Sequence, residues 1–315
     1  MSGIFFVLYP NGIGNKPFHR TLYLTQRTNS IYLFILNKNL VLQSEAVAPW
    51  LAPYAYGIVI LGFIFFLFRI FENWYAANFD KPLFRNYLVF KKLSSAQLAI
   101  LTTEFSFYNK LSEKQKKQFE HRVAKFVSEK KFVGRGELEI TELMTVLIAA
   151  VGCMLSFGRK NYIYSLIEFI LIYPEEFYSK VNNDYHKGEF NPRERALVLS
   201  WKDFEEGFKI SNDNLNVGIH EFMHAMQLES TKNRDLDSIR FTKQFQNILK
   251  ELTRQEVKNQ LDKTEFFRAY AFTNQYEFMA VLAEYFFESP ADFKRIFPNI
   301  YNYTKKLLNF NFAGY

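Results

Sequence analysis

The chain has 315 residues, a formal net charge of +7 and a pI near 9.1. This length allows one large domain or two small ones, and the single cysteine, Cys153, excludes an internal disulfide and fits a reducing compartment. The lysines alternate with acidic residues, as between Ser112 and Lys117, which is typical of solvated helix faces. No signature of a nucleic-acid-binding module accompanies them, so the charge favours an anionic membrane surface over nucleic acid as a partner.

The first strongly apolar segment runs from Trp50 to Phe68 without a charged residue. A helix of this length spans about 28 Å, close to the thickness of a bilayer's hydrocarbon core. Aromatic residues typical of membrane interfaces flank it, namely Trp50 and Tyr54 at one end and Trp74 and Tyr75 past the other. We predict one transmembrane helix over residues 50–71. The alternative is a buried helix of a soluble core, although core helices rarely stay apolar on every side for this long.

The charges around this segment predict its orientation. It begins too late for an ordinary cleaved signal peptide, so it should be retained as an anchor. Arg69, Lys81 and Arg85 follow it, whereas only Lys38 precedes it at a comparable distance. The positive-inside rule therefore predicts a single-pass protein of the inner (cytoplasmic) membrane with its C-terminal part in the cytoplasm.

Two stretches flank the predicted anchor. Residues 1–49 form an N-terminal extension whose apolar part, Ile31 to Leu42, is too short to span a membrane. Residues 72–93 form a juxtamembrane linker. From there, residues 94–315 have the pattern of one α+β domain.

The domain is predicted to be mostly helical with a few strands. Helical periodicity covers residues 111–128 and 141–157, with a turn at Gly134-Arg135-Gly136 between them. Residues 167–173 and 196–201 are rich in β-branched and aromatic residues and are predicted strands. Further helices are predicted at about 215–229, at 236–258 and from Asn274 to Glu288, the last ending before Pro290.

The most informative motif lies in the helix predicted at 215–229 and reads His220-Glu221-Phe222-Met223-His224. Residues i and i+4 lie on one helix face with Cβ atoms about 5–6 Å apart. Both imidazoles can therefore reach one zinc ion at about 2.0–2.1 Å. Glu221 lies about one hundred degrees round the helix, where it can act as the base for the attacking water. The alternative is that two histidines share a helix face by chance.

A catalytic zinc site usually has a third protein ligand and one open position. No histidine follows His224 in the sequence, so the third ligand should be a carboxylate from the last predicted helix. Glu277 and Glu284 are seven residues apart there and lie on nearly the same face. Glu277 can instead belong to a capping box, and Glu284 can accept a hydrogen bond from a histidine N–H. Asp235 and Asp237 are weaker candidates for that acceptor role.

Several segments between about Phe105 and Phe297 occur in an order typical of one family. They are Gly134-Arg135-Gly136 with Leu138-Glu139-Ile140-Thr141, then Tyr173-Pro174-Glu175-Glu176-Phe177, Leu197-Val198-Leu199-Ser200-Trp201, the zinc motif, and Tyr270 through Phe287. Together they resemble the zinc-dependent peptidases of the Mlc titration factor A type, distantly similar to the anthrax lethal factor protease domain. The chain departs from that family in its N-terminal anchor and in the continuation of its metal helix, Ala225-Met226-Gln227-Leu228-Glu229.

The resemblance implies a mostly helical, zincin-like metallopeptidase domain with a small sheet. It implies that Glu277 is the third zinc ligand and that Tyr270 faces the metal, where a phenol can donate to the oxyanion of a tetrahedral intermediate. It also implies a rival function, because the named relative sequesters a transcriptional repressor. In that case the zinc site is structural or vestigial, and a transcriptional regulator is the partner.

We therefore expect a membrane-anchored zinc peptidase acting on a peptide or protein substrate. His220, His224 and Glu277 hold Zn²⁺ in this hypothesis, and Glu221 and Tyr270 are catalytic. An extended substrate can pair with the strand predicted at 196–201 if that strand lies at a sheet edge. The alternatives are the regulatory binding protein and a membrane-associated scaffold without metal.

Overall fold

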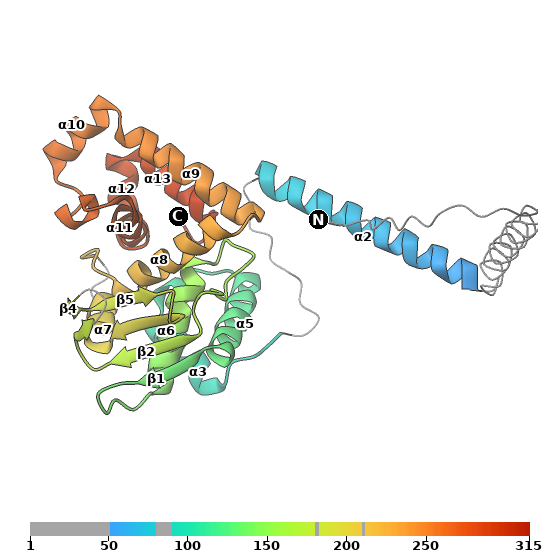
Figure 1. Cartoon of the computed structure of the whole chain (residues 1–315), viewed down its shortest axis with the longest axis horizontal. Coiled ribbons are helices and arrows are strands. Elements are labelled where there is room, and N and C mark those ends of the chain that lie inside the picture. The colour runs from blue at the N-terminus through green and yellow to red at the C-terminus, as the bar shows by residue number, and fades with distance from the viewer. Residues whose placement is uncertain (1–50, 80–89, 180–182, 210–211) are drawn as a thin grey trace, which may run out of the picture. The chain divides into compact units, whose positions relative to one another are not determined.

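A computed structural model of the chain describes residues 51–79, 90–179, 183–209 and 212–315 (Figure 1). The chain divides into two units, residues 1–69 and residues 70–315. The N-terminal extension predicted at residues 1–49 lies outside the described residues, as does the middle of the predicted linker.

Helix α2 runs from Ala52 to Phe79, beginning within the predicted anchor and ending beyond it. Its part from Ala52 to Glu72 is long and apolar enough to cross a membrane, and its most apolar stretch is not buried within the described chain. Side chains such as Phe63 and Phe65 are about three-fifths exposed. By length and composition this helix fits a membrane span, which would cover these side chains.

The main sheet has four strands in the order β1-β2-β6-β5. Their bounds are Lys131–Gly134 for β1, Phe169–Tyr173 for β2, Ala196–Ser200 for β6 and Gly188–Asn191 for β5. β1, β2 and β6 are parallel, and β5 is antiparallel to β6. Strands β2 and β6 correspond to the two predicted strands, whose apolar runs are typical of a buried parallel sheet.

The sheet edge differs from the prediction. β6 pairs with β2 on one side and with β5 on the other, so residues 196–201 do not form an edge. β5 is the outer strand, and the sequence does not reveal it because Gly188-Glu189-Phe190-Asn191 is short and carries no apolar alternation. The sheet's other outer strand is β1, and α8 contacts β5, so an extended peptide near α8 would have to meet β5.

Helices α3 (Ser95–Glu104), α5 (Glu113–Glu129) and α6 (Glu142–Leu155) lie together on one side of the sheet (Figure 1). α6 is buried along almost its whole length and contacts α8, which runs from Val217 to Lys232. The close approach needs Gly152, because a Cβ there would lie 2.9 Å from the Phe222 ring of α8.

Helix α8 occupies the centre of the domain. It contacts α6, β5 and β6 on one side and α9 and α11 on the other, and Figure 1 shows it passing between the sheet and the C-terminal helices. The remaining elements are α4 (Ser106–Asn109), β3 (Phe177–Ser179), β4 (Asp184–His186), α7 (Trp201–Lys209), α9 (Leu236–Leu252), α10 (Gln255–Thr264), η2 (Ala269–Phe272), α11 (Gln275–Glu288), α12 (Pro290–Ile296) and α13 (Pro298–Leu308).

One predicted helix is divided. The stretch 236–258 forms α9 and α10, because Arg254 adopts an extended conformation between them. No proline or glycine marks this break. Tertiary contacts favour it: the bend buries Val257 and lets the Gln260 side chain donate to the carbonyl of Ile296. The overall class is as predicted, a mostly helical α+β domain with a small mixed sheet.

Candidate metal centre

Helix α8 presents two histidines on its polar side. The Asn216 side chain caps the helix by accepting the Ile219 N–H at 3.0 Å. The apolar side anchors it in the core, with Phe222 and Met223 fully buried. His220 and His224 then lie one turn apart, with ring centroids separated by 4.8 Å. The core therefore fixes the helix and leaves both imidazoles facing α11.

Glu277 reaches both imidazoles from the first turn of α11. Its Oε2 lies 2.9 Å from Nε2 of His220, and its Oε1 lies 3.5 Å from Nε2 of His224. Capping of α11 is performed by Asn274, whose side chain accepts the N–H groups of Tyr276 and Glu277. The candidate ligand atoms of His220, His224 and Glu277 all lie within 4.8 Å of one another.

Glu284 contacts the other ring nitrogen of His220, Nδ1. Its Oε1 accepts from Nδ1–H of His220 at 2.6 Å, and its side chain is 1% exposed. Sequence spacing left the roles of the two glutamates open. The geometry distinguishes them, because Glu277 faces the Nε2 atoms of both histidines and Glu284 faces Nδ1 of His220. Asp235 instead caps α9, and Asp237 accepts the backbone N–H of Lys160.

Burial and hydrogen bonding act in opposite directions on the charges of this cluster. Burial favours the neutral imidazole of His220, but hydrogen bonds with Glu277 and Glu284 raise its pKa to about 10. Burial likewise opposes ionisation of Glu277, yet the two histidines hold the pKa of this carboxyl well below its usual range. Two imidazoles and a carboxylate in this arrangement fit the donor set of a zinc ion.

Glu221 lies on the side of α8 that faces the sheet edge. It is 7% exposed, and burial raises the pKa of its carboxyl, while the backbone N–H of Phe190 in β5 donates to it. Gly188 makes this contact close, because a Cβ there would lie 2.7 Å from Cγ of Glu221 and 2.5 Å from Val217. Strand β5 therefore holds the glutamate from the side opposite its helix.

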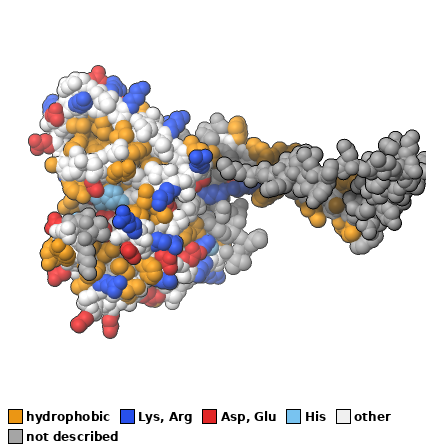
Figure 2. Space-filling view, in the orientation of Figure 1, with side chains coloured by type: hydrophobic (Ala, Val, Ile, Leu, Met, Phe, Trp, Pro, Cys, Tyr) orange, Lys and Arg blue, Asp and Glu red, His pale blue; other side chains and the backbone are white. Residues whose placement is uncertain are grey.

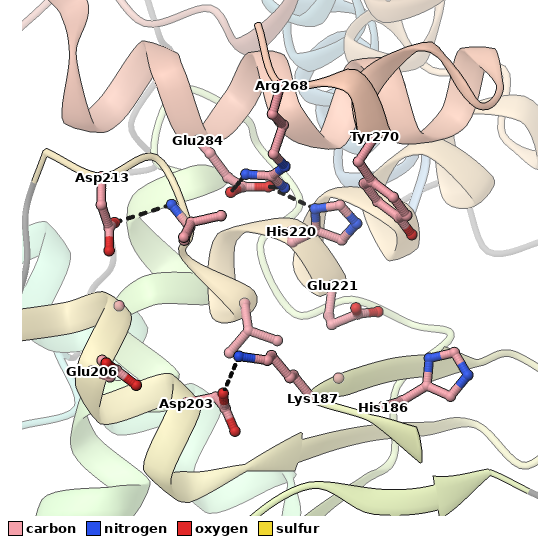
Figure 3. A pocket seen from close by; sticks show the side chains of 14 residues that line it. His186, Lys187, Asp203, Glu206, Asp213, His220, Glu221, Arg268, Tyr270 and Glu284 are labelled. Atoms are coloured by element: carbon pink, nitrogen blue, oxygen red, sulfur yellow. Dashed lines mark hydrogen bonds and ion pairs between the residues drawn. The ribbon is translucent and has the colours of Figure 1, made fainter. Parts of the chain in front are cut away.

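Tyr270 lies in η2, and Figure 3 shows it beside His220, with ring centroids 6.0 Å apart. Burial and the neighbouring charge of Glu277 raise the pKa of its phenol to about 12. The group is therefore a neutral O–H donor at physiological pH, and it hydrogen-bonds with Glu277. Half of the residue is exposed, so a bound molecule can reach it.

A cavity of about 350 Å³ opens beside these residues (Figure 3). Figure 2 shows a histidine side chain on this face of the domain, between the sheet side and the C-terminal helices. Lys187 and Asp203 on the far wall form an ion pair at 2.7 Å. The cavity leaves space for a substrate next to His220 and Glu221, both of which line it.

Arg268 is a residue of this site that the motifs did not indicate. Its two terminal nitrogens each donate to a different oxygen of Glu284, both at 2.8 Å. Its Nη1 also donates to the carbonyl of Asn214 in the segment before α8. Arg268 and Glu284 are sixteen residues apart and meet only because η2 turns the chain back over α11. No local sequence pattern therefore predicts the contact between Arg268 and Glu284.

Comparison with known proteins assigns the domain. Residues 84–308 match the family described as glucose-regulated metallo-peptidase M90. The chain belongs to this family. An uncharacterized protein of Synechocystis is 25% identical over 66% of this chain and 81% of its own length. Mlc titration factor A of Cronobacter sakazakii is 26% identical over 61% of this chain and 77% of its own.

The corresponding protein of Pectobacterium atrosepticum, also named Mlc titration factor A, is 25% identical over 62% of this chain and 79% of its own length. The predicted resemblance is therefore confirmed. Membership of a metallo-peptidase family also agrees with a cluster of two histidines and a glutamate that can hold a metal.

Proposed function

We propose that this M90 family member is a membrane-anchored zinc-dependent peptidase, with residues 94–315 as its catalytic domain. The observation that carries the proposal is the meeting of His220, His224 and Glu277 within 4.8 Å, with Glu221 beside them at a cavity. A donor set of two imidazoles and one carboxylate favours zinc over magnesium or calcium, which prefer oxygen ligands.

The chain's own residues then divide the reaction between them. Zinc held by His220, His224 and Glu277 would supply a Lewis acid that activates water and polarises the substrate carbonyl. Glu221 takes the proton of the attacking water and delivers it to the leaving amine. The hydrogen bond from Phe190 keeps the Glu221 carboxylate in place, and burial raises its pKa, which favours proton uptake. The Tyr270 O–H donates to the oxyanion as the carbonyl carbon becomes tetrahedral.

The outer strand β5 offers a place for the substrate backbone. Within the described residues its ladder partner is β6, and the Phe190 N–H on its other edge donates to Glu221, so an extended peptide would pair with the remaining backbone groups of that edge. Because β5 also holds Glu221 through Phe190, a peptide paired with it would pass close to the catalytic base. A complex in which the substrate runs away from β5 would contradict this step.

Helix α2 would attach the domain to the membrane. Its length and composition support a single span, and the lysine and arginine residues that follow it favour a cytoplasmic catalytic domain. Fractionation with protease accessibility in spheroplasts tests this: the domain should be in the inner-membrane fraction and resist external protease until the cells are lysed.

A second function is supported by the names of the relatives. Two of them are called Mlc titration factor A, which is a regulatory name, so the alternative is a protein that sequesters a transcriptional regulator with a structural or vestigial zinc site. The acidic residue Glu221, placed to act as a base, mildly favours hydrolysis over this alternative.

The decisive experiment uses the full-length chain in detergent and the variant Glu221→Gln. Wild type should contain about one zinc per chain and cleave members of a mixed peptide library, and the variant should keep the metal and lose cleavage by about 10²–10⁴-fold. Glu205→Gln is the matched control and should behave as wild type, because Glu205 of α7 does not line the cavity and pairs with Lys209. Zinc without cleavage in wild type, or a variant with every cellular effect intact, would favour the binding function.

A further inference from the structure

We propose that Arg268 is a positioning residue for the metal centre, which it orients through Glu284 and His220. This inference rests on the proposed metal ligands but not on hydrolysis. Arg268 hydrogen-bonds to Glu284, which in turn contacts His220, so its effect on the metal would pass through one carboxylate. Its role is therefore measurable as metal affinity.

The contact between Arg268 and Glu284 has the geometry of a clamp. Nη1 donates to Oε2 and Nη2 to Oε1, each at 2.8 Å, so two parallel bonds fix the plane of the carboxylate. The Glu284 side chain is 1% exposed, and Arg268 is the cation that balances it. A buried carboxylate without such a partner is strongly unfavourable.

The orientation of Glu284 in turn sets that of His220. Oε1, one of the two clamped oxygens, accepts Nδ1–H of the imidazole at 2.6 Å. With Nδ1 committed as a donor, the lone pair of Nε2 is left for a metal. Rotation of the carboxylate about its own axis would tilt the ring, because Nδ1 of His220 is hydrogen-bonded to this carboxylate.

Arg268 is itself held from two further directions. Its Nη1 also donates to the carbonyl of Asn214, in the segment that leads into α8. Its guanidinium lies 5.9 Å from the ring centroid of Tyr270, two residues later in the chain. One guanidinium thus connects the start of the histidine helix, the glutamate helix α11 and the tyrosine of η2.

A lysine could balance the charge but could not reproduce this clamp. Its single ammonium carries no planar pair of donors, so it would leave the carboxylate free to rotate. Loss of an outer partner of a metal-bound histidine typically weakens metal affinity by 10–100-fold. We therefore expect Arg268→Met to weaken zinc binding by about 10–100-fold and Arg268→Lys to fall between Arg268→Met and wild type.

The test measures Zn²⁺ affinity of the full-length protein by competition with a chromophoric chelator. The absorption spectrum of the Co²⁺-loaded protein should also change in Arg268→Met, because the ligand field depends on how His220 is oriented. Arg254→Met is the matched control, since Arg254 donates to the buried Glu251 at 3.0 Å in another part of the domain. It should leave both readouts unchanged.

A double-mutant cycle separates positioning from general support of the fold. If Arg268 acts through Glu284, adding Arg268→Met to Glu284→Gln should cost little further zinc affinity. Additive losses, or wild-type affinity and cobalt spectrum in Arg268→Met, would overturn the proposal. Where Arg268→Met does not fold, the same cycle is made with Arg268→Lys. A wild type that binds zinc but cleaves nothing would contradict the peptidase function and leave this inference standing.

Discussion

The cavity beside the metal centre has two unlike walls. One wall is formed by α8 and α11, whose inward residues, such as Phe222 and Met279, are fully buried. The other is formed by α7, η2 and β5 with Lys187 just before it; the Lys187 side chain is 60% exposed and Tyr270 is 50% exposed. The first wall is a rigid part of the core, and the second is a surface.

This difference matches what each wall has to do. Metal ligands must be held within a few tenths of an ångström, which close packing of two core helices achieves. Side chains that contact substrate peptides of varying sequence must instead be exposed to solvent, so that the peptide can reach them. Glu221 belongs to both walls, since it stands on α8 but is held by the backbone of Phe190 in β5. Substitutions of the candidate ligands and of the residues that orient them should therefore affect metal and activity together, and substitutions of groups that face the substrate should affect activity alone.

The largest effect is expected in the helical wall, for Glu277→Gln. The amide is a poorer ligand and cannot balance the charge of the zinc ion, so zinc affinity should fall by at least about 100-fold, and cleavage with it. The measurement is metal content after dialysis against a chelator. Glu265→Gln, an exposed side chain just before η2, should keep its zinc. A fully metallated Glu277→Gln would remove this residue from the ligand set.

The first test of the exposed wall is Tyr270→Phe. Removing one donor to the oxyanion should lower kcat by about 10²–10³-fold while KM and zinc content stay close to wild type. Tyr276→Phe is the matched control, because this tyrosine has the same 50% exposure and lies near the start of α11. Equal kcat values for the two variants would show that Tyr270 only lines the cavity.

The two walls also differ in how far the sequence predicts them. The motif in α8 predicts its helix to within a few residues, because histidines at i and i+4 lie on the same face only when the segment is helical. Glu277 and Glu284 share one helix face, so spacing left their roles open, and only the position of α11 over His220 distinguishes them. That packing is a tertiary property.

The exposed wall was largely not predictable. β5 has four residues without an apolar pattern, and its contact with Glu221 depends on how the chain returns along β6. The clamp between Arg268 and Glu284 depends in the same way on a short 3₁₀ turn. Periodicity reports burial along one element, whereas these contacts join elements that are distant in sequence.

Gly188→Ala should move the exposed wall relative to the helical wall. The new Cβ would lie 2.5 Å from Val217 and 2.7 Å from Cγ of Glu221, so β5 or the glutamate must shift. We expect kcat/KM to fall by about tenfold or more with zinc affinity nearly unchanged, since a displacement of 1 Å can cost up to about 100-fold in rate. The control is Gly62→Ala, where nothing lies within 4 Å. Loss of zinc in Gly188→Ala would show that the two walls do not act separately.

The smallest effect concerns stability at the end of the helical wall. Burial raises the pKa of Glu288 to about 8, with smaller contributions from the charges of Glu284 and Asp213, while hydrogen bonds from Asn216 and from the backbone at Asn214 oppose the rise. An unfolded glutamate titrates near 4.3, so between about pH 4.5 and 8 the folded state binds more protons than the unfolded state. The free energy of unfolding should therefore fall as the pH rises through this range.

Glu288→Gln should remove this part of the pH dependence, because the amide keeps the shape and cannot ionise. The measurement is the urea midpoint of the detergent-solubilised chain at pH 5, 6.5 and 8. Glu256→Gln, whose side chain is 81% exposed, should keep the wild-type slope. If Glu288→Gln and wild type lose stability in parallel, the end of α11 is open to water. The helical wall would then be closed only around its histidines and Glu284.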